Sequence, residues 1–292
     1  MVRSAHSLAI LCSHTSPARS SAKTMIVECE GKQVVCPGCR RSTEKRRAYV
    51  EGETDFLICQ HCGLVFRECL PSTSELASIY ASHYEATNIV RGCTEQESGE
   101  FALTAYCQFL RRRLEPRLTR VLDYGAGTGR LVELFREAGF QADGLEFAHA
   151  ARRHGLEYRG ITLFARPAEL PEGVYDLVTM IEVIEHLANL MEELMAIRKA
   201  MQRGGMLFVT TPNRVGLRAR MEKGYWREAR KKFHLFLFDR HSLKHILLRA
   251  GFSSVEVVHF SPVPKPGRLF WLYGRVCQCL RLGGTLCVTA RR

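Results

Sequence analysis

Four cysteines in the first quarter of the chain have the spacing of metal ligands. Cys36-Pro-Gly-Cys39 and Cys59-Gln-His-Cys62 form two Cys-x-x-Cys pairs separated by 19 residues. Each pair brings two thiolates together at a turn, and the separation lets a hairpin carry the second pair across to the first. The pattern predicts a zinc ribbon with four cysteine ligands, in which the ion holds the fold and offers no open position for catalysis. Iron–sulfur ligation by the same four thiols is the alternative.

A glycine-rich turn marks a second site. Asp123-Tyr124-Gly125-Ala126-Gly127-Thr128-Gly129 follows an apolar strand pattern and opens a helix pattern, a context in which glycines let the backbone approach a nucleotide-like ligand. The third glycine comes one residue too early for a dinucleotide loop. An Asp before the glycines suits a cationic ligand group, such as the α-amino group of S-adenosylmethionine.

Glu146 adds a second carboxylate to this turn. It stands 19 residues past Gly127, at the end of the next predicted strand, where a carboxylate accepts hydrogen bonds from two adjacent ribose hydroxyls. Strand, glycines and spaced Glu together favour a cofactor pocket over a tight strand-to-helix connection without a ligand.

The elements that position these residues alternate in type after residue 120. Apolar runs predict strands at 121–123, 142–147, 161–164, 175–181, 206–210, 255–260 and 286–290, and amphipathic periodicity predicts helices at 131–138, 190–201 and 239–250. Such alternation implies a Rossmann-like α/β fold, with a mostly parallel sheet covered by helices on both faces.

The chain divides into four predicted parts. We expect residues 1–24 to be a disordered N-terminal extension, with a transit peptide or an over-extended start as alternatives. Residues 25–70 read as the zinc-ribbon domain and 71–118 as a helical linker or substrate cap. Residues 119–292 form the main α/β domain.

The composition limits the class of protein. With 292 residues, 46% hydrophobic and 25% charged, the chain is not wholly disordered. No apolar run approaches the roughly 20 residues of a membrane-spanning helix. The uneven use of cysteine fits a reducing compartment, which predicts a cytoplasmic protein. The net charge of +12 suggests nucleic acid, but the basic residues are spread along the chain and identify no partner.

Several motifs together resemble class I S-adenosylmethionine-dependent methyltransferases over about residues 100–292. The resemblance is carried by residues 123–129, Glu146, the 175–178 strand, Ile181-Glu-Val-Ile-Glu185-His186-Leu187, and Gly204-Gly205 followed by 206–213. It implies a seven-stranded sheet whose last strand is antiparallel, a role that residues 286–290 fit.

The resemblance also implies a cofactor site. Its residues would be Asp123, Tyr124, Gly125, Ala126, Gly127, Gly129, Glu146, Phe147, Ala168 and Ile181. By this resemblance Asp123 and the glycine backbone hold the methionine end and Glu146 holds the ribose. Residues 166–170 flank the adenine, but this chain lacks the Asp that the family often has there.

The acceptor side has its own candidates. The chain lacks the Asn/Asp-Pro-Pro-Tyr motif that grips planar amines, which counts against methylation of an adenine or glutamine nitrogen. His186, beside Glu185 at the carboxyl edge of the sheet, is the first candidate base and His234 the second, with capping or packing as the alternative for each. Glu182, Glu185, His186 and His234 also resemble a divalent-metal quartet of small-RNA 2′-O-methyltransferases and some quinone O-methyltransferases, which would bind Mg²⁺ or Mn²⁺.

These motifs predict a methyltransferase acting on the oxygen or carbon of a small molecule, such as a sugar, polysaccharide precursor, quinone or secondary metabolite. A zinc ribbon before such a core resembles bacterial enzymes of this kind. One alternative is an RNA methyltransferase that uses the zinc ribbon and the basic clusters at 111–113 and 227–232. The other is a non-catalytic binding protein. The oligomeric state stays open.

Overall fold

The computed structural model describes most of the chain, namely residues 26–49, 55–71, 75–76, 78–79, 97–114, 119–260 and 282–292. The predicted extension at 1–24 lies outside these residues, as does much of the 71–118 segment. Within the described ranges, no helix is long and apolar enough to cross a membrane.

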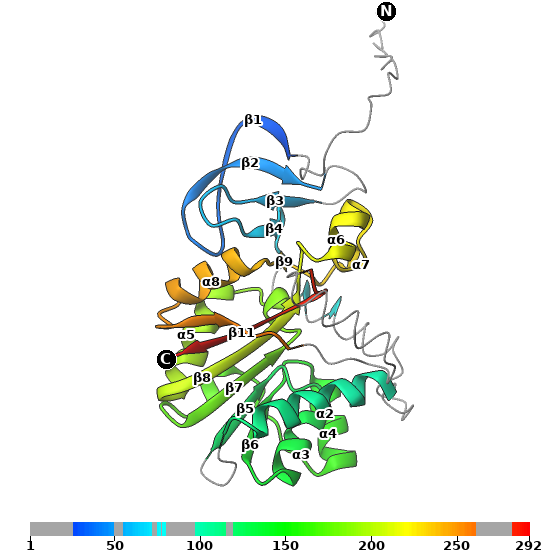
Figure 1. The fold of residues 1–292 in the computed structure, drawn as a ribbon, viewed down its shortest axis with the longest axis vertical. Coiled ribbons are helices and arrows are strands. Elements are labelled where there is room, and N and C mark those ends of the chain that lie inside the picture. The colour runs from blue at the N-terminus through cyan, green and yellow to red at the C-terminus, as the bar shows by residue number, and fades with distance from the viewer. Residues whose placement is uncertain are drawn as a thin grey trace, which may run out of the picture.

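A mainly parallel sheet forms the larger half of the molecule (Figure 1). Its strands are, in spatial order, β10 (Val255–Val257), β11 (Thr285–Arg291), β8 (Met201–Pro212), β7 (Tyr175–Ile181), β5 (Arg120–Tyr124) and β6 (Gln141–Leu145). Strands β5 to β8 pair in parallel, whereas β11 runs antiparallel to both β8 and β10. The expected antiparallel last strand is therefore present.

The number of strands differs from the expectation. Among the described residues this sheet has six strands, and the expected strand at 161–164 is reduced to a single parallel bridge between Phe164 and Leu145. The chain turns into the short 3-10 helix η3 (Pro167–Glu169) soon after the bridge. A proline at the start of that turn has no N–H to donate, so the ladder cannot extend through it.

Helices cover both faces of the sheet, because successive side chains of each strand point to opposite faces and both faces are apolar. In β5, Val121 belongs to the core formed with α2 (Glu97–Arg111) and α3 (Arg130–Glu137), and the adjacent Leu122 belongs to the opposite core. That opposite core is formed with α5 (Leu190–Ala200) and α8 (Arg240–Arg249). Within the described ranges the structure also has α4 (His149–Arg159), η4 (Ile184–His186), α6 (Leu217–Glu222), η5 (Lys223–Tyr225) and α7 (Arg227–Arg230).

A second, antiparallel sheet carries the cysteine pairs (Figure 1). It contains β1 (Ile26–Val35), β2 (Ser42–Ala48), β3 (Phe56–Ile58), β4 (Val65–Arg67) and β9 (Phe236–Leu237), in that order. Strand β9 is distant in sequence from the other four strands of this sheet. The four cysteines also share one continuous core with α5 and α8. An added Cβ at Gly38 would lie 2.3 Å from Ile246 Cδ1, so the first cysteine turn packs tightly on α8.

Candidate active site

The glycine turn leaves the carboxyl end of β5 in a left-handed path. Gly125, Gly127 and Gly129 have φ angles of 85°, 55° and 83°, which other residues rarely adopt. The N–H groups of Gly125 and Ala126 both donate to the Leu145 carbonyl, at 2.8 and 2.9 Å. These bonds join the turn to the end of β6, so its backbone is set before any ligand binds.

Two carboxylates flank this turn. Asp123 is 4% exposed and accepts a hydrogen bond of 2.7 Å from the Thr179 hydroxyl. Burial raises the pKa of Asp123 to about 7, against the lowering effect of that hydroxyl. Glu146 is 8% exposed and accepts from the N–H groups of Gly127 and Ala148, at 2.9 and 2.8 Å. A carboxylate has about four lone-pair sites, so Glu146 retains capacity for a further donor.

The other residues expected to bind the cofactor differ in how far their side chains are exposed. The Tyr124 hydroxyl donates to Glu193 at 2.7 Å, and its ring meets the exposed ring of Phe147 edge to face. Ala168 is exposed in η3, while Ile181 is half-buried against the α2–α3 core. Phe147 and Ala168 therefore have surfaces open to a ligand, and Tyr124 and Ile181 are held mainly by the protein.

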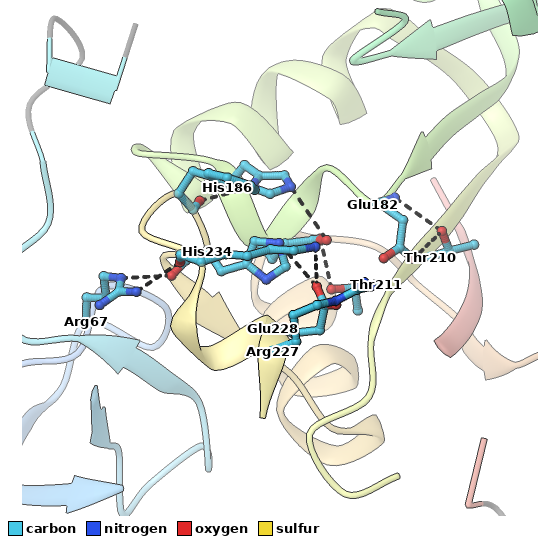
Figure 2. A network of polar contacts seen from close by, with 11 residues as sticks. Arg67, Glu182, His186, Thr210, Thr211, Arg227, Glu228 and His234 are labelled. Atoms are coloured by element: carbon cyan, nitrogen blue, oxygen red, sulfur yellow. Dashed lines mark hydrogen bonds and ion pairs between the residues drawn. The ribbon is translucent and has the colours of Figure 1, made fainter. Parts of the chain in front are cut away.

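Glu185, His186 and His234 form a compact group beyond the carboxyl end of β7. Figure 2 shows the two imidazoles of this group side by side. One possible ligand atom of each of the three residues lies within 4.8 Å of the others. Glu185 and His186 belong to η4, whereas His234 arrives from the loop before β9. The His186 Nε2 atom lies 3.7 Å from Glu185 Oε1. The structure thus brings together all three residues expected to take part in catalysis.

The hydrogen bonds of this group show which atoms can accept. His186 Nδ1 lies 2.9 Å from the Phe233 carbonyl, which can only accept; in the tautomer that donates this bond, Nδ1 carries the proton of the neutral ring and Nε2 has the lone pair. Glu185 Oε2 accepts from the Thr211 hydroxyl at 2.9 Å, but Oε1 is buried without a hydrogen bond. The buried Nδ1 of His234 has none either.

Burial also sets the charge of this group. It raises the pKa of Glu185 well above its ordinary value, and the nearby Glu182 charge adds to the effect. It lowers the pKa of His186 to about 4 and that of His234 to about 2, so both imidazoles are neutral at pH 7. Neutral imidazoles can act as metal ligands or bases.

Glu182 stands apart from the other members of the expected quartet (Figure 2). Its backbone is left-handed, with φ of 56°, where β7 ends, and its carboxylate accepts from the Thr210 hydroxyl at 3.1 Å. A left-handed conformation is strained for a residue with a side chain and often marks a functional position. The solvent-accessible Glu182 lines a cavity of about 290 Å³. Its other lining residues are Pro212, Asn213, Arg218, Ala219, Trp226, Arg227, Glu228, Lys231, Gly284 and Thr285.

The four predicted zinc ligands meet in a buried cluster. Cys36 Sγ lies 3.6 Å from Cys62 Sγ, and Cys39 Sγ lies 3.6 Å from Cys59 Sγ, without a disulfide among them. The two turns have the same backbone pattern. The carbonyls of Cys36 and Cys59 accept from the N–H groups four residues on, at Arg40 and Gly63. Both of these residues have positive φ angles, 57° and 72°.

Several contacts of the site had no sequence signal. Arg67, from β4, donates to the carbonyls of His234 and Lys231, and Glu228 lies 3.7 Å from His234 Nε2. No spacing rule links these residues, because their neighbourhood arises from the pairing of β4 with β9. Thr211 belongs to the 206–213 motif, but that motif does not predict its hydrogen bond to Glu185.

Comparison with known proteins places the core in a family. Residues 98–257, more than half of the chain, match the family described as "Methyltransferase domain". The ubiquinone biosynthesis O-methyltransferase of Bordetella pertussis is 38% identical over 105 residues, which are 32% of this chain and 43% of that protein. Its counterpart in Xanthomonas axonopodis pv. citri is 32% identical over 117 residues, 37% of this chain and 48% of that protein. The chain thus spans less than half the length of these relatives.

A solved structure supports the same fold. The 1,6-didemethyltoxoflavin-N1-methyltransferase of Burkholderia thailandensis, determined with S-adenosylhomocysteine, has a TM-score of 0.52 and 16% identity. The similarity covers 84% of this chain and 97% of that one. Such low identity supports the fold and leaves the reaction to be argued from the site. The match over more than half of the chain shows that it belongs to the methyltransferase-domain family.

Proposed function

We propose that the protein transfers the methyl group of S-adenosylmethionine to a hydroxyl oxygen of a small acceptor molecule. The observation that carries the proposal is the meeting of Glu185, His186 and His234 at the carboxyl edge of the sheet, where buried acceptor atoms of Glu185 and His234 lack hydrogen bonds. The O-methyltransferase names of the curated relatives support oxygen as the methylated atom.

The cofactor half of the reaction rests on Asp123 and Glu146. The carboxylate of Asp123 would pair with the α-ammonium group, and the carboxylate of Glu146 would accept from the ribose hydroxyls. Bound S-adenosylmethionine supplies an electrophilic methyl group for in-line displacement. The rigid glycine turn would fix the cofactor's direction, which is the alignment that such a displacement requires.

We further propose that Glu185, His186 and His234 hold a divalent cation. One carboxylate oxygen and two neutral imidazoles suit Mn²⁺ better than Mg²⁺, because imidazole is a poor ligand for Mg²⁺. A bound cation would lower the pKa of an acceptor hydroxyl. In a cation-free site, Nε2 of neutral His186 is the candidate proton acceptor.

The cavity beside Glu182 is our candidate acceptor pocket. At about 290 Å³ it stands at the small end of ligand sites, which suits a single ring or one sugar. Arg218 of α6, Arg227 of α7 and Trp226, which directly precedes α7, supply its outer wall. We therefore propose residues 214–236 as the main acceptor wall, with 71–118 as a second cap.

The cysteine cluster is proposed to hold one structural Zn²⁺. Tetrahedral zinc with Zn–S bonds of about 2.3 Å places its sulfurs about 3.8 Å apart, close to the observed 3.6 Å separations. All four thiols are buried, so no position is open to substrate. We propose residues 25–70 as the zinc module and 119–292 as the methyltransferase domain.

A labelled-cofactor screen tests the function. Purified protein with Mn²⁺ and methyl-labelled S-adenosylmethionine is incubated with catechols, hydroxybenzoates, sugars and RNA, and products are identified by mass spectrometry and NMR. We expect a methyl ether of a small hydroxyl compound, and no product from Asp123→Asn. Methyl groups found only on carbon, on nitrogen or in RNA would contradict the proposal.

A further inference from the structure

Residues 231–237 lie between the cysteine-bearing sheet and the catalytic group. On one side, Phe236 and Leu237 pair with Phe66 and Val65 of β4. On the other side, the Leu235 N–H donates to the Glu185 carbonyl at 2.8 Å. The segment that carries His234 is therefore bonded both to the cysteine-bearing sheet and to η4.

Arg67, the last residue of β4, completes this connection (Figure 2). Its Nε donates to the His234 carbonyl at 3.0 Å and its Nη2 to the Lys231 carbonyl at 2.9 Å. These two carbonyls belong to the ends of one turn, closed by the bond from His234 N–H to the Lys231 carbonyl. The planar guanidinium thus fixes both ends of the turn, which a single ammonium cannot do with the same geometry.

Arg67 is itself held in place. Its guanidinium forms an ion pair with Asp55 and lies 4.6 Å from the centre of the Phe56 ring. The Arg67 side chain is 13% exposed and lies on the buried Phe56 ring, whereas the Asp55 side chain is 47% exposed, so the ring contact is shielded from water and the ion pair is not. Phe56 is the first residue of β3 and Asp55 directly precedes that strand, and the Cys59 N–H donates to the Leu64 carbonyl directly before β4. The turn that begins at Cys59 is therefore hydrogen-bonded to the residue directly before the strand that carries Arg67.

We infer that Arg67 is a positioning residue that sets His234 against Glu185 and His186, so that the cysteine-bearing sheet supports the proposed divalent-cation site. The inference rests on the proposed function of these three residues. It implies that loss of Arg67 weakens the divalent-cation site while the cofactor pocket, at Asp123 and Glu146, stays intact. Loss of zinc would act through the same contacts.

Mn²⁺ titration of the zinc-loaded protein tests this inference. We compare the wild type with Arg67→Met, Arg67→Lys and the control Arg47→Met, by calorimetry and by the Mn²⁺ resonance signal. Arg47 is an exposed residue of β2 in the same sheet, so its replacement makes the same chemical change away from the turn.

Arg67→Met is expected to weaken Mn²⁺ binding by about tenfold or more, as loss of a ligand's supporting contact does. Arg67→Lys should fall between Arg67→Met and the wild type, and Arg47→Met should bind like the wild type. Zinc content and S-adenosylhomocysteine affinity should be unchanged in every variant. Should Arg67→Met fail to fold, the intermediate affinity of Arg67→Lys carries the test.

Three results would overturn the inference. Wild-type Mn²⁺ affinity in both Arg67 variants would remove the positioning role and leave the proposed function standing. An equal loss of S-adenosylhomocysteine affinity would show general disruption instead of local positioning. A wild-type protein that takes up no Mn²⁺ would overturn both the inference and the proposed cation site, which separates the two kinds of failure.

Discussion

The affinity for S-adenosylhomocysteine should depend on pH through Asp123. Burial raises the pKa of this carboxyl to about 7, and the neighbouring charge of Glu146 adds to the increase. The ammonium group of the ligand pairs only with the charged carboxylate. Binding therefore requires loss of a proton below pH 7, and affinity must fall as the pH falls through that value.

The size of the effect follows from the pKa. The apparent dissociation constant is the intrinsic one multiplied by one plus the ratio of protonated to charged Asp123. With a pKa of about 7 it rises about tenfold between pH 8 and pH 6, with close to one proton released per ligand bound at pH 6. Calorimetric titration in two buffers of different ionisation enthalpy measures both quantities.

Two variants frame this measurement. Asp123→Asn should bind weakly at pH 8 and show little dependence on pH. Asp176→Asn makes the same change at the amino ends of the parallel strands, where the Asp176 carboxylate accepts from Arg120 N–H. This variant should keep the wild-type dependence of affinity on pH. An affinity constant from pH 6 to 8, with no proton release in the wild type, would refute the reasoning.

Three further changes test other parts of the site. Cys39→Ser should reduce zinc from about one to near zero per chain by elemental analysis and lower the melting temperature, and an unchanged melting temperature would count against a structural ion. Gly125→Ala places a Cβ 2.4 Å from Val183 Cγ2 at a φ of 85°, so unfolding by denaturant should show a loss of about 2–4 kcal/mol; a wild-type midpoint would contradict that steric argument. Mn²⁺ at a hundred times its dissociation constant should stabilise the wild type by about 2.7 kcal/mol, seen as a higher melting temperature, and Glu185→Gln should lose this response; a response kept by the variant would exclude Glu185 as a ligand.

The parallel sheet and its cofactor turn were predictable because their signals are local. The strand expected at 175–181 is present over those residues, since an apolar run buried on both faces has little freedom of register. The helix expected at 239–250 begins at a capping box between Asp239 and Ser242 and ends before Gly251, with φ of 93°.

The acceptor side was less predictable because it depends on contacts distant in sequence. Strand β9 has two residues, and its partner Phe66 is far from Phe236 along the chain, so no local periodicity announces it. Without that pairing Arg67 has no connection to His234. Glu182 likewise lies apart from the other three residues and has a left-handed backbone angle, and the motif encodes neither feature.

The structure of the protein bound to S-adenosylhomocysteine tests the central claim most directly. We predict that the ribose hydroxyls lie on Glu146 and the amino group on Asp123, with the sulfur directed toward Glu185, His186 and His234. A ligand bound elsewhere, or a sulfur directed away from these three residues, would contradict the account.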